Sequence, residues 1–182
     1  MAAVLEIAND PALKDQTAFN LAVWEKVLAD PFYHSLEHRI ETNAVGQIIM
    51  SPPPAYRHGE EQAKICKLLW SLMEGGSVIT ECPISTPDGV RAADVAWISD
   101  QRKQNSTSDV VLTTAPEVCV EVLSPSNTKR EMEEKKSLFF AAGADEVWFC
   151  SESGELSFFL EDKASAIARS SLCPEFPAKI EV

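Results

Sequence analysis

Long apolar runs and paired cysteines are both missing from this sequence of 182 residues. The longest apolar runs, such as Val118 to Leu123, have the length of a strand, whereas a bilayer span needs roughly 20 apolar residues. The five cysteines are scattered and include no CxxC pair, so we expect reduced core residues rather than a zinc site or a redox dithiol. The sequence therefore predicts no membrane association.

Secretory features and internal repeats are missing as well. The N-terminal segment MAAVLEIANDPALKD carries acidic residues where a signal peptide carries a basic region, so we expect a cytoplasmic protein. A chain of 182 residues that is 45% hydrophobic has the size and apolar content for one domain. We predict that residues 1–182 form a single domain, with a helical N-terminal extension over 1–38 and a core over about 39–160.

Positive charge is scarce. Asp and Glu number 28 against 16 Lys and Arg, which gives a formal net charge of -12 at pH 7. Non-specific nucleic-acid binders obtain most of their affinity from Lys and Arg on phosphates, so the composition counts against this class.

The residues that are present follow two periodicities, those of helices and of strands. Helical spacing is found over 17–29, 57–73 and 128–142. The last of these begins with the capping-box spacing of Thr128 and Glu131 and ends before Gly143. Strand patterns are found in two hairpins, 39–50 and 77–98, in a buried strand over 116–123, and over 146–150 and 156–160. The polar residues 100–108 predict a loop. This order predicts an α/β fold, with a central mixed sheet flanked by helices.

Two carboxylates in apolar surroundings mark a candidate site. Alternation places Glu121 on a strand whose faces are otherwise apolar, and Asp94 holds a similar position on the preceding strand. If these strands are neighbours, the carboxylates converge, and Mg²⁺ accepts one or two carboxylates while keeping several waters. The structural alternatives are a buried ion pair of Glu121 with Lys135 or Arg91, and a strand-end position for Asp94.

Lys135 lies centrally on the inward face of the helix 128–142, whereas Lys136 is turned about a quarter-turn away. An ammonium directed into the protein could orient an attacking water or stabilise a phosphate. The structural alternative is a long side chain that extends its charge to solvent.

Glu61 shares the apolar stripe of the helix 57–73 and could reach the site as a further carboxylate. The alternative is an acid in the first helical turn, favoured by the helix dipole. His58, near the start of the same helix, is most simply a surface residue.

Four segments together resemble a bacterial family of restriction-endonuclease-like proteins, in their order and spacing: RHGEEQAKICKLL, RAADVAWIS, APEVCVEVLSPSN and EKKSLFFAAGADEVWFC. The likeness runs from about Arg39 to Phe159, and the family belongs to the PD-(D/E)xK nuclease superfamily. The resemblance implies a restriction-endonuclease-like core, a Mg²⁺ or Mn²⁺ cofactor and DNA as the substrate.

The acids of the family motifs have counterparts in this sequence. Asp94 matches the first motif's aspartate, although Ala93 replaces the proline before it. Glu121 matches the acid of the second motif, and the superfamily often uses the next backbone carbonyl, here that of Val122, as a further ligand. Glu41 also matches a family acid, without a role that we can assign.

The motif lysine departs from the superfamily pattern, because Leu123 stands at its position. This family carries the lysine on the next helix, where it corresponds to Lys135. The resemblance thus implies a Mg²⁺-dependent endodeoxyribonuclease in which Asp94 and Glu121 hold the metal, Glu61 assists and Lys135 orients water. Many nucleases of this fold dimerise to cut two strands, so a homodimer is implied as an option. Two alternatives stay open: a non-catalytic binding module that keeps the fold, and an enzyme acting on another phosphate substrate.

Overall fold

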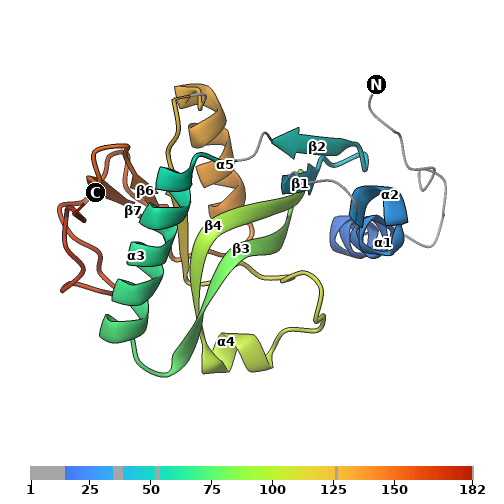
Figure 1. Cartoon of the computed structure of the whole chain (residues 1–182). Coiled ribbons are helices and arrows are strands. Elements are labelled where there is room, and N and C mark those ends of the chain that lie inside the picture. Colours follow the sequence, from blue (N-terminus) through green and yellow to red (C-terminus); the bar gives the residue numbers. More distant parts are fainter. Residues whose placement is uncertain (1–14, 35–38, 52–53, 126, 182) are drawn as a thin grey trace.

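The computed structural model describes residues 15–34, 39–51, 54–125 and 127–181. Residues 1–14 and 35–38 of the expected N-terminal extension, and with them most of the segment that we compared with a signal peptide, lie outside this range. The helices and strands follow in the order α1 Gln16–Ala29, α2 Pro31–His34, β1 Arg39–Thr42, β2 Ile48–Ser51, α3 Tyr56–Leu72, β3 Gly76–Thr86, β4 Gly89–Ser99, α4 Asp100–Gln104, β5 Val118–Val122, α5 Lys129–Ala141, β6 Glu146–Cys150 and β7 Leu156–Phe159 (Figure 1).

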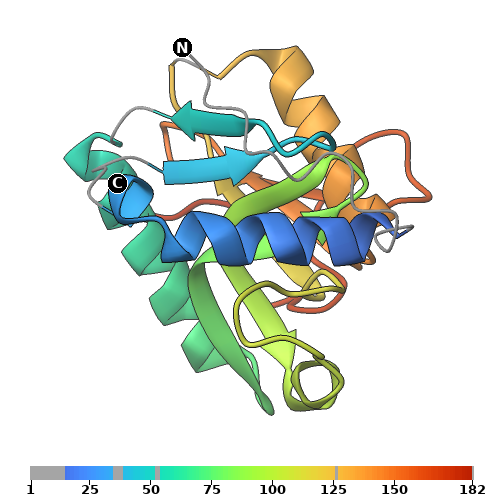
Figure 2. The same cartoon turned by 90° about the vertical axis from the view of Figure 1, so that its right-hand side faces the viewer.

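A five-stranded sheet in the order β3-β4-β5-β6-β7 forms the centre of the molecule. β5 and β6 are parallel and α5 connects them, whereas the other neighbouring strands are antiparallel. β1 and β2 form a separate hairpin beside β4 (Figure 2). The predicted α/β fold with a mixed sheet is confirmed.

The sheet is covered on both faces because its central strands are apolar on both sides. Val118, Val120 and Val122 of β5 pack with Ile65 and Leu69 of α3 in one core. The alternate residue Cys119 packs in a second core with residues of α5, among them Phe139. α3 and α5 thus enclose β5 between them, which is typical of a parallel crossover.

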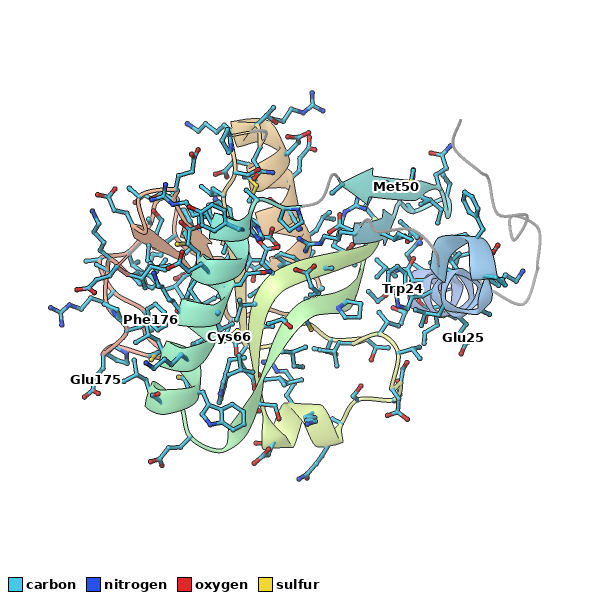
Figure 3. The ribbon with its side chains drawn as sticks, viewed as in Figure 1. Trp24, Glu25, Met50, Cys66, Glu175 and Phe176 are labelled. Atoms are coloured by element: carbon cyan, nitrogen blue, oxygen red, sulfur yellow. The ribbon has the colours of Figure 1, made fainter. Side chains whose placement is uncertain are left out.

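Two further segments extend these cores. On α1, Trp24 points toward β3 and β4, whereas Glu25 points away (Figure 3). Near the C-terminus, Phe176 joins the core on the α3 side, against which Cys66 also packs, although this segment lies beyond the range 39–160 expected for the core. All five cysteines are free, as the scattered pattern predicts. Within the described residues, no helix combines the length and apolar content that crossing a bilayer requires.

The polar segment 100–108 contains a short helix, α4, so the prediction of a loop throughout it was wrong. The Ser99 side chain accepts a hydrogen bond from the backbone N–H of Arg102, at 3.1 Å, and caps the helix start. Asp100 lies in the first turn and Arg102 and Lys103 in the last, which suits the helix dipole. These local signals outweigh the lack of an apolar stripe.

Candidate active site

β4 and β5 separate where Asp94 and Glu121 lie opposite each other. Their paired register ends at Val95 and Val120, one residue earlier. In place of the next ladder hydrogen bond, the backbone N–H of Val122 donates to Asp94 Oδ2 at 2.6 Å. Asp94 is 1% exposed and Glu121 4% exposed, so both carboxylates are buried where the two strands separate.

Lys135 reaches this gap from α5. The capping box of Thr128 and Glu131 fixes the start of the helix, as predicted. Lys135 Nζ lies 2.8 Å from Glu121 Oε2 and 3.3 Å from Glu41 Oε1. Lys136 is equally buried but does not reach the gap: it pairs with the exposed Glu133 and lies over the ring of Phe159. The helical spacing therefore gave the correct direction for Lys135.

Glu41 joins the hairpin β1–β2 to the site. Its Oε1 accepts a hydrogen bond from the backbone N–H of Ala92, at 2.9 Å, and also faces Lys135. Burial works against the ionised form, but the charges of Lys135 and Arg39 outweigh it and lower the pKa of Glu41. The family acid without an assigned role thus belongs to the same ionic cluster.

Arg39 is the first site residue that the sequence analysis missed. Its guanidinium donates to Asp94 Oδ1 and to the carbonyl of Ala92, and its Nε lies 3.3 Å from Glu81 Oε2. Burial would lower the pKa of Arg39, but the charges of Glu121, Asp94 and Glu41 raise it above its ordinary value. Its position at the start of an imperfectly alternating strand gave no signal.

His58 is the second missed residue, since the sequence favoured a surface position. Its side chain is 14% exposed, and its Nε2 lies 3.3 Å from Asp94 Oδ2. The hydrogen bond with Asp94 raises the pKa of His58. His58 Nδ1 is buried and has no hydrogen-bond partner among the described residues. Its spacing of three residues from Glu61 on one helix was a signal that could have identified it.

Glu61 is buried on α3 beside this cluster. Its Oε1 lies 3.6 Å from Arg57 Nε and makes no hydrogen bond with any residue that the structure describes. Burial raises the pKa of Glu61, and the charges that modify it most are those of Arg57, His58 and Glu152. Neither Asp94 nor Glu121 is among its ion-pair or hydrogen-bond partners in the described part of the chain, so Glu61 borders the pair rather than completing it.

The two central carboxylates have opposite electrostatics. For Asp94, burial favours the neutral form, but the hydrogen bond with His58 and the charge of Arg39 outweigh it and lower the pKa to about 2. For Glu121, burial raises the pKa to about 7; the charge of Lys135 opposes this rise and that of Asp94 adds to it. The cluster is therefore short of positive charge at Glu121.

The chemistry of the donors fits a hard divalent cation. No three His, Cys, Asp or Glu side chains in the described ranges lie close enough together to hold a metal by themselves. Mg²⁺ needs only one or two carboxylates with its waters, however, and Asp94, Glu121 and the Val122 carbonyl offer two carboxylates and one carbonyl. Within the part of the chain that the structure describes, Glu121 Oε1 is buried without a hydrogen-bond partner, a state that a bound cation would relieve.

The mixed sheet and the helices on its two faces define a restriction-endonuclease-like fold. The chain belongs to the Uma2 family, described as "Putative restriction endonuclease", whose model matches residues 29–178. Its fold is similar to that of a crystal structure described as "a putative nuclease belonging to DUF820 from Anabaena variabilis ATCC 29413". The TM-score is 0.67, over 86% of this chain and 93% of that chain, at 15% sequence identity. No curated protein sequence matches the chain.

Proposed function

We propose that this protein is a nuclease that hydrolyses phosphodiester bonds in DNA, with Mg²⁺ or Mn²⁺ held by Asp94, Glu121 and the Val122 carbonyl. One observation carries the proposal: Glu121 is buried opposite Asp94, bound on one oxygen by Lys135 and without a partner on the other among the described residues. Most buried side-chain oxygens in folded proteins have a hydrogen-bond partner, so the unpartnered oxygen of Glu121 calls for an explanation. Membership of a nuclease family supports phosphodiesters as the substrate class.

The residues around the pair have distinct roles in this proposal. A bound divalent ion would make a bound water more acidic and offset phosphate charge. Lys135, whose pKa the charges of Glu121 and Glu41 raise in spite of burial, keeps its ammonium and can orient a water or stabilise a phosphate oxygen. Glu41 holds Lys135 in place from the other side. Glu61 is an accessory carboxylate at the border.

Access for DNA is compatible with the acidic composition. The N-terminal ends of α3 and α5 lie at the same end of the sheet as the hairpin β1–β2 (Figures 1 and 2). They carry the exposed cations Arg57, Lys129 and Arg130. Helix N-termini and cations both favour phosphate, so this end is the DNA-facing side in our proposal, although the net charge is -12.

The direct test is cutting of plasmid DNA by the purified protein in Mg²⁺ or Mn²⁺. Glu121→Gln keeps the size of the side chain but removes its charge, and we expect cutting to fall on the order of 100-fold or more, as for other losses of transition-state stabilisation. Glu155→Gln, which changes an exposed carboxylate, should cut like the wild type. Equal cutting by the wild type and Glu121→Gln would indicate a contaminating nuclease and refute the proposal.

A second candidate is a non-catalytic module that binds nucleic acid. Both oxygens of Asp94 already have partners, which favours a non-catalytic role, although the net charge of -12 counts against binding to nucleic acid. DNA binding without cutting at millimolar Mg²⁺ or Mn²⁺ would support it. Cleavage of a small phosphodiester but not of DNA would instead indicate another phosphate substrate. Formation of a homodimer stays a prediction.

A further inference from the structure

The carboxylate of Asp94 is fully engaged by the protein itself. Oδ1 accepts from the Arg39 guanidinium, while Oδ2 accepts from the Val122 N–H at 2.6 Å and lies 3.3 Å from His58 Nε2. A metal ion at Asp94 would meet a positive charge already in contact with its ligand. Arg39 and a divalent ion therefore compete for the same oxygen.

Arg39 interacts with the whole acidic cluster rather than with Asp94 alone. Its Nη2 lies 3.8 Å from Glu41 Oε1, and the charges of Glu121, Asp94 and Glu41 all stabilise its guanidinium. The side chain is only 19% exposed, so solvent screens these interactions weakly. Arg39 thus neutralises in part the carboxylates that would otherwise repel one another.

The backbone of β3 is distorted next to this contact. The β3–β4 ladder pairs Thr80 with Val95 and Cys82 with Ala93, but omits Glu81, the residue opposite Asp94. Glu81 has a φ of 49°, and among the described residues it alone has a positive φ without being glycine. L-residues adopt this conformation only at a cost in free energy.

The distortion places a carboxylate at the edge of the site. Gln62 Nε2 donates to Glu81 Oε1 at 2.7 Å and to the carbonyl of Asp94 at 3.2 Å, replacing the lost ladder contact. Glu81 Oε2 then lies 3.3 Å from Arg39 Nε, on a side chain that is 48% exposed. Arg39 therefore bridges the buried Asp94 and the half-exposed Glu81, in addition to its longer contact with Glu41. Backbone strain that is retained beside a reactive site points to a function for the strained residue.

We infer that Arg39 is a built-in counter-cation, which a divalent ion must displace from Asp94, and that Glu81 retains the displaced guanidinium at the edge of the site. The inference rests on the proposed metal site but concerns its affinity rather than its chemistry. In the metal-free protein Arg39 stabilises the fold by pairing with the buried carboxylates. The same pairing lowers the affinity of the site for a metal ion. Glu81 limits this loss of affinity because it binds the displaced guanidinium.

The test is titration calorimetry with Mn²⁺ alone, on the full chain without DNA. Arg39→Gln should bind Mn²⁺ on the order of tenfold more tightly than the wild type, because a nearby positive charge is lost. Arg130→Gln removes the same charge from an exposed pair with Glu134 and should bind like the wild type. Metal-free Arg39→Gln should also melt at a lower temperature, with a larger Mn²⁺-induced rise in melting temperature than the wild type shows.

Glu81→Gln keeps the test informative if Arg39→Gln does not fold, since it leaves the buried cluster intact. It should bind Mn²⁺ several-fold more weakly than the wild type, whereas unchanged affinity would refute the role of Glu81. Equal affinity of the wild type and Arg39→Gln would overturn the inference and leave the proposed function standing. An equal gain in Arg130→Gln would also overturn it, as a general charge effect. No Mn²⁺ binding by any variant would remove the metal site, and with it both proposals.

Discussion

Two buried glutamates on neighbouring parallel strands, Glu121 on β5 and Glu146 on β6, have opposite surroundings. Both are almost fully buried, and they lie near opposite ends of the two strands. Glu146 Oε1 accepts from two backbone N–H groups, those of Ser171 and Leu172, at 2.6 and 3.0 Å. Its Oε2 accepts from the indole N–H of Trp148 at 2.6 Å. Fixed neutral donors therefore satisfy both oxygens of Glu146.

Among the described residues, Glu121 has one donor, the Lys135 ammonium on Oε2, and none on Oε1. The comparison shows that burial of a carboxylate does not by itself identify a functional site. A carboxylate that accepts hydrogen bonds on both oxygens, as Glu146 does, connects parts of the chain, in this case the C-terminal segment and β6. An unsaturated carboxylate beside further charges has remaining capacity for a ligand.

The largest expected effect concerns Glu146, whose two carboxylate oxygens both accept hydrogen bonds. Glu146→Ala leaves three donors without acceptors, and each unsatisfied buried group costs about 1–3 kcal/mol. We expect the free energy of unfolding, measured by urea denaturation, to fall by about 3 kcal/mol or more. Glu155→Ala, at an exposed position, should change it little. If Glu146→Ala lowered the free energy of unfolding as little as the control does, Glu146 would not have the stabilising role that the comparison gives it.

The second effect concerns the pH dependence of the metal-free protein. The pKa of Glu121 is raised to about 7, so its contribution to stability is fully present below the ordinary value of 4.5 and is lost as the pH rises through 7. The free energy of unfolding of the wild type, relative to Glu121→Gln, should therefore fall between pH 4.5 and 7, by up to about 3 kcal/mol.

Asp94 does not interfere in that window. Its pKa is lowered to about 2, so its contribution is lost only as the pH falls below 3.8. A difference between the wild type and Glu121→Gln that stays constant from pH 4.5 to 7 would contradict the unsaturated state of Glu121.

The smallest effect concerns the turn that presents donors to Glu146. Ser170 Oγ accepts from the backbone N–H of Cys173 at 2.8 Å and is buried. Ser170→Ala should lower the free energy of unfolding by about 1 kcal/mol, as for one lost hydrogen bond, and should leave Mn²⁺ affinity unchanged. Altered Mn²⁺ affinity would show that the two glutamates are coupled, contrary to the comparison.

The sequence was most informative where the signals are local. Period-two alternation and helical spacing gave the sheet strands and α1, α3 and α5, and the inward direction of Lys135 followed from its helix. The difference between the surroundings of Glu121 and Glu146 could not be predicted from the sequence. Both glutamates stand in apolar strands, and their hydrogen-bond donors come from other parts of the chain. The donors of Glu146 lie 25 and 26 residues away in the chain, in a segment without regular secondary structure.

Arg39 and His58 could not be found from periodicity for a similar reason. Arg39 meets Asp94 across 55 residues of chain. His58 faces Asp94 because α3 packs across β4, a tertiary contact without a sequence period. The positive φ of Glu81 could not be predicted from the sequence either, because glutamate has no preference for positive φ. The family resemblance added Glu41, which the local pattern did not distinguish.

The two ion pairs of the site close chain loops of different lengths. Glu121 and Lys135 are 14 residues apart, within the unit β5–α5–β6, whereas Arg39 and Asp94 are 55 residues apart and join the separate hairpin β1–β2 to the main sheet. Short loops close at lower entropic cost, so the β5–α5–β6 half of the site can form early in folding, before the hairpin docks. Opening of the hairpin would take Arg39 away from Asp94, whereas the pair of Glu121 and Lys135 lies wholly within the β5–α5–β6 unit. The site is thus assembled from two parts of the chain, and the arginine belongs to the part that closes the longer loop.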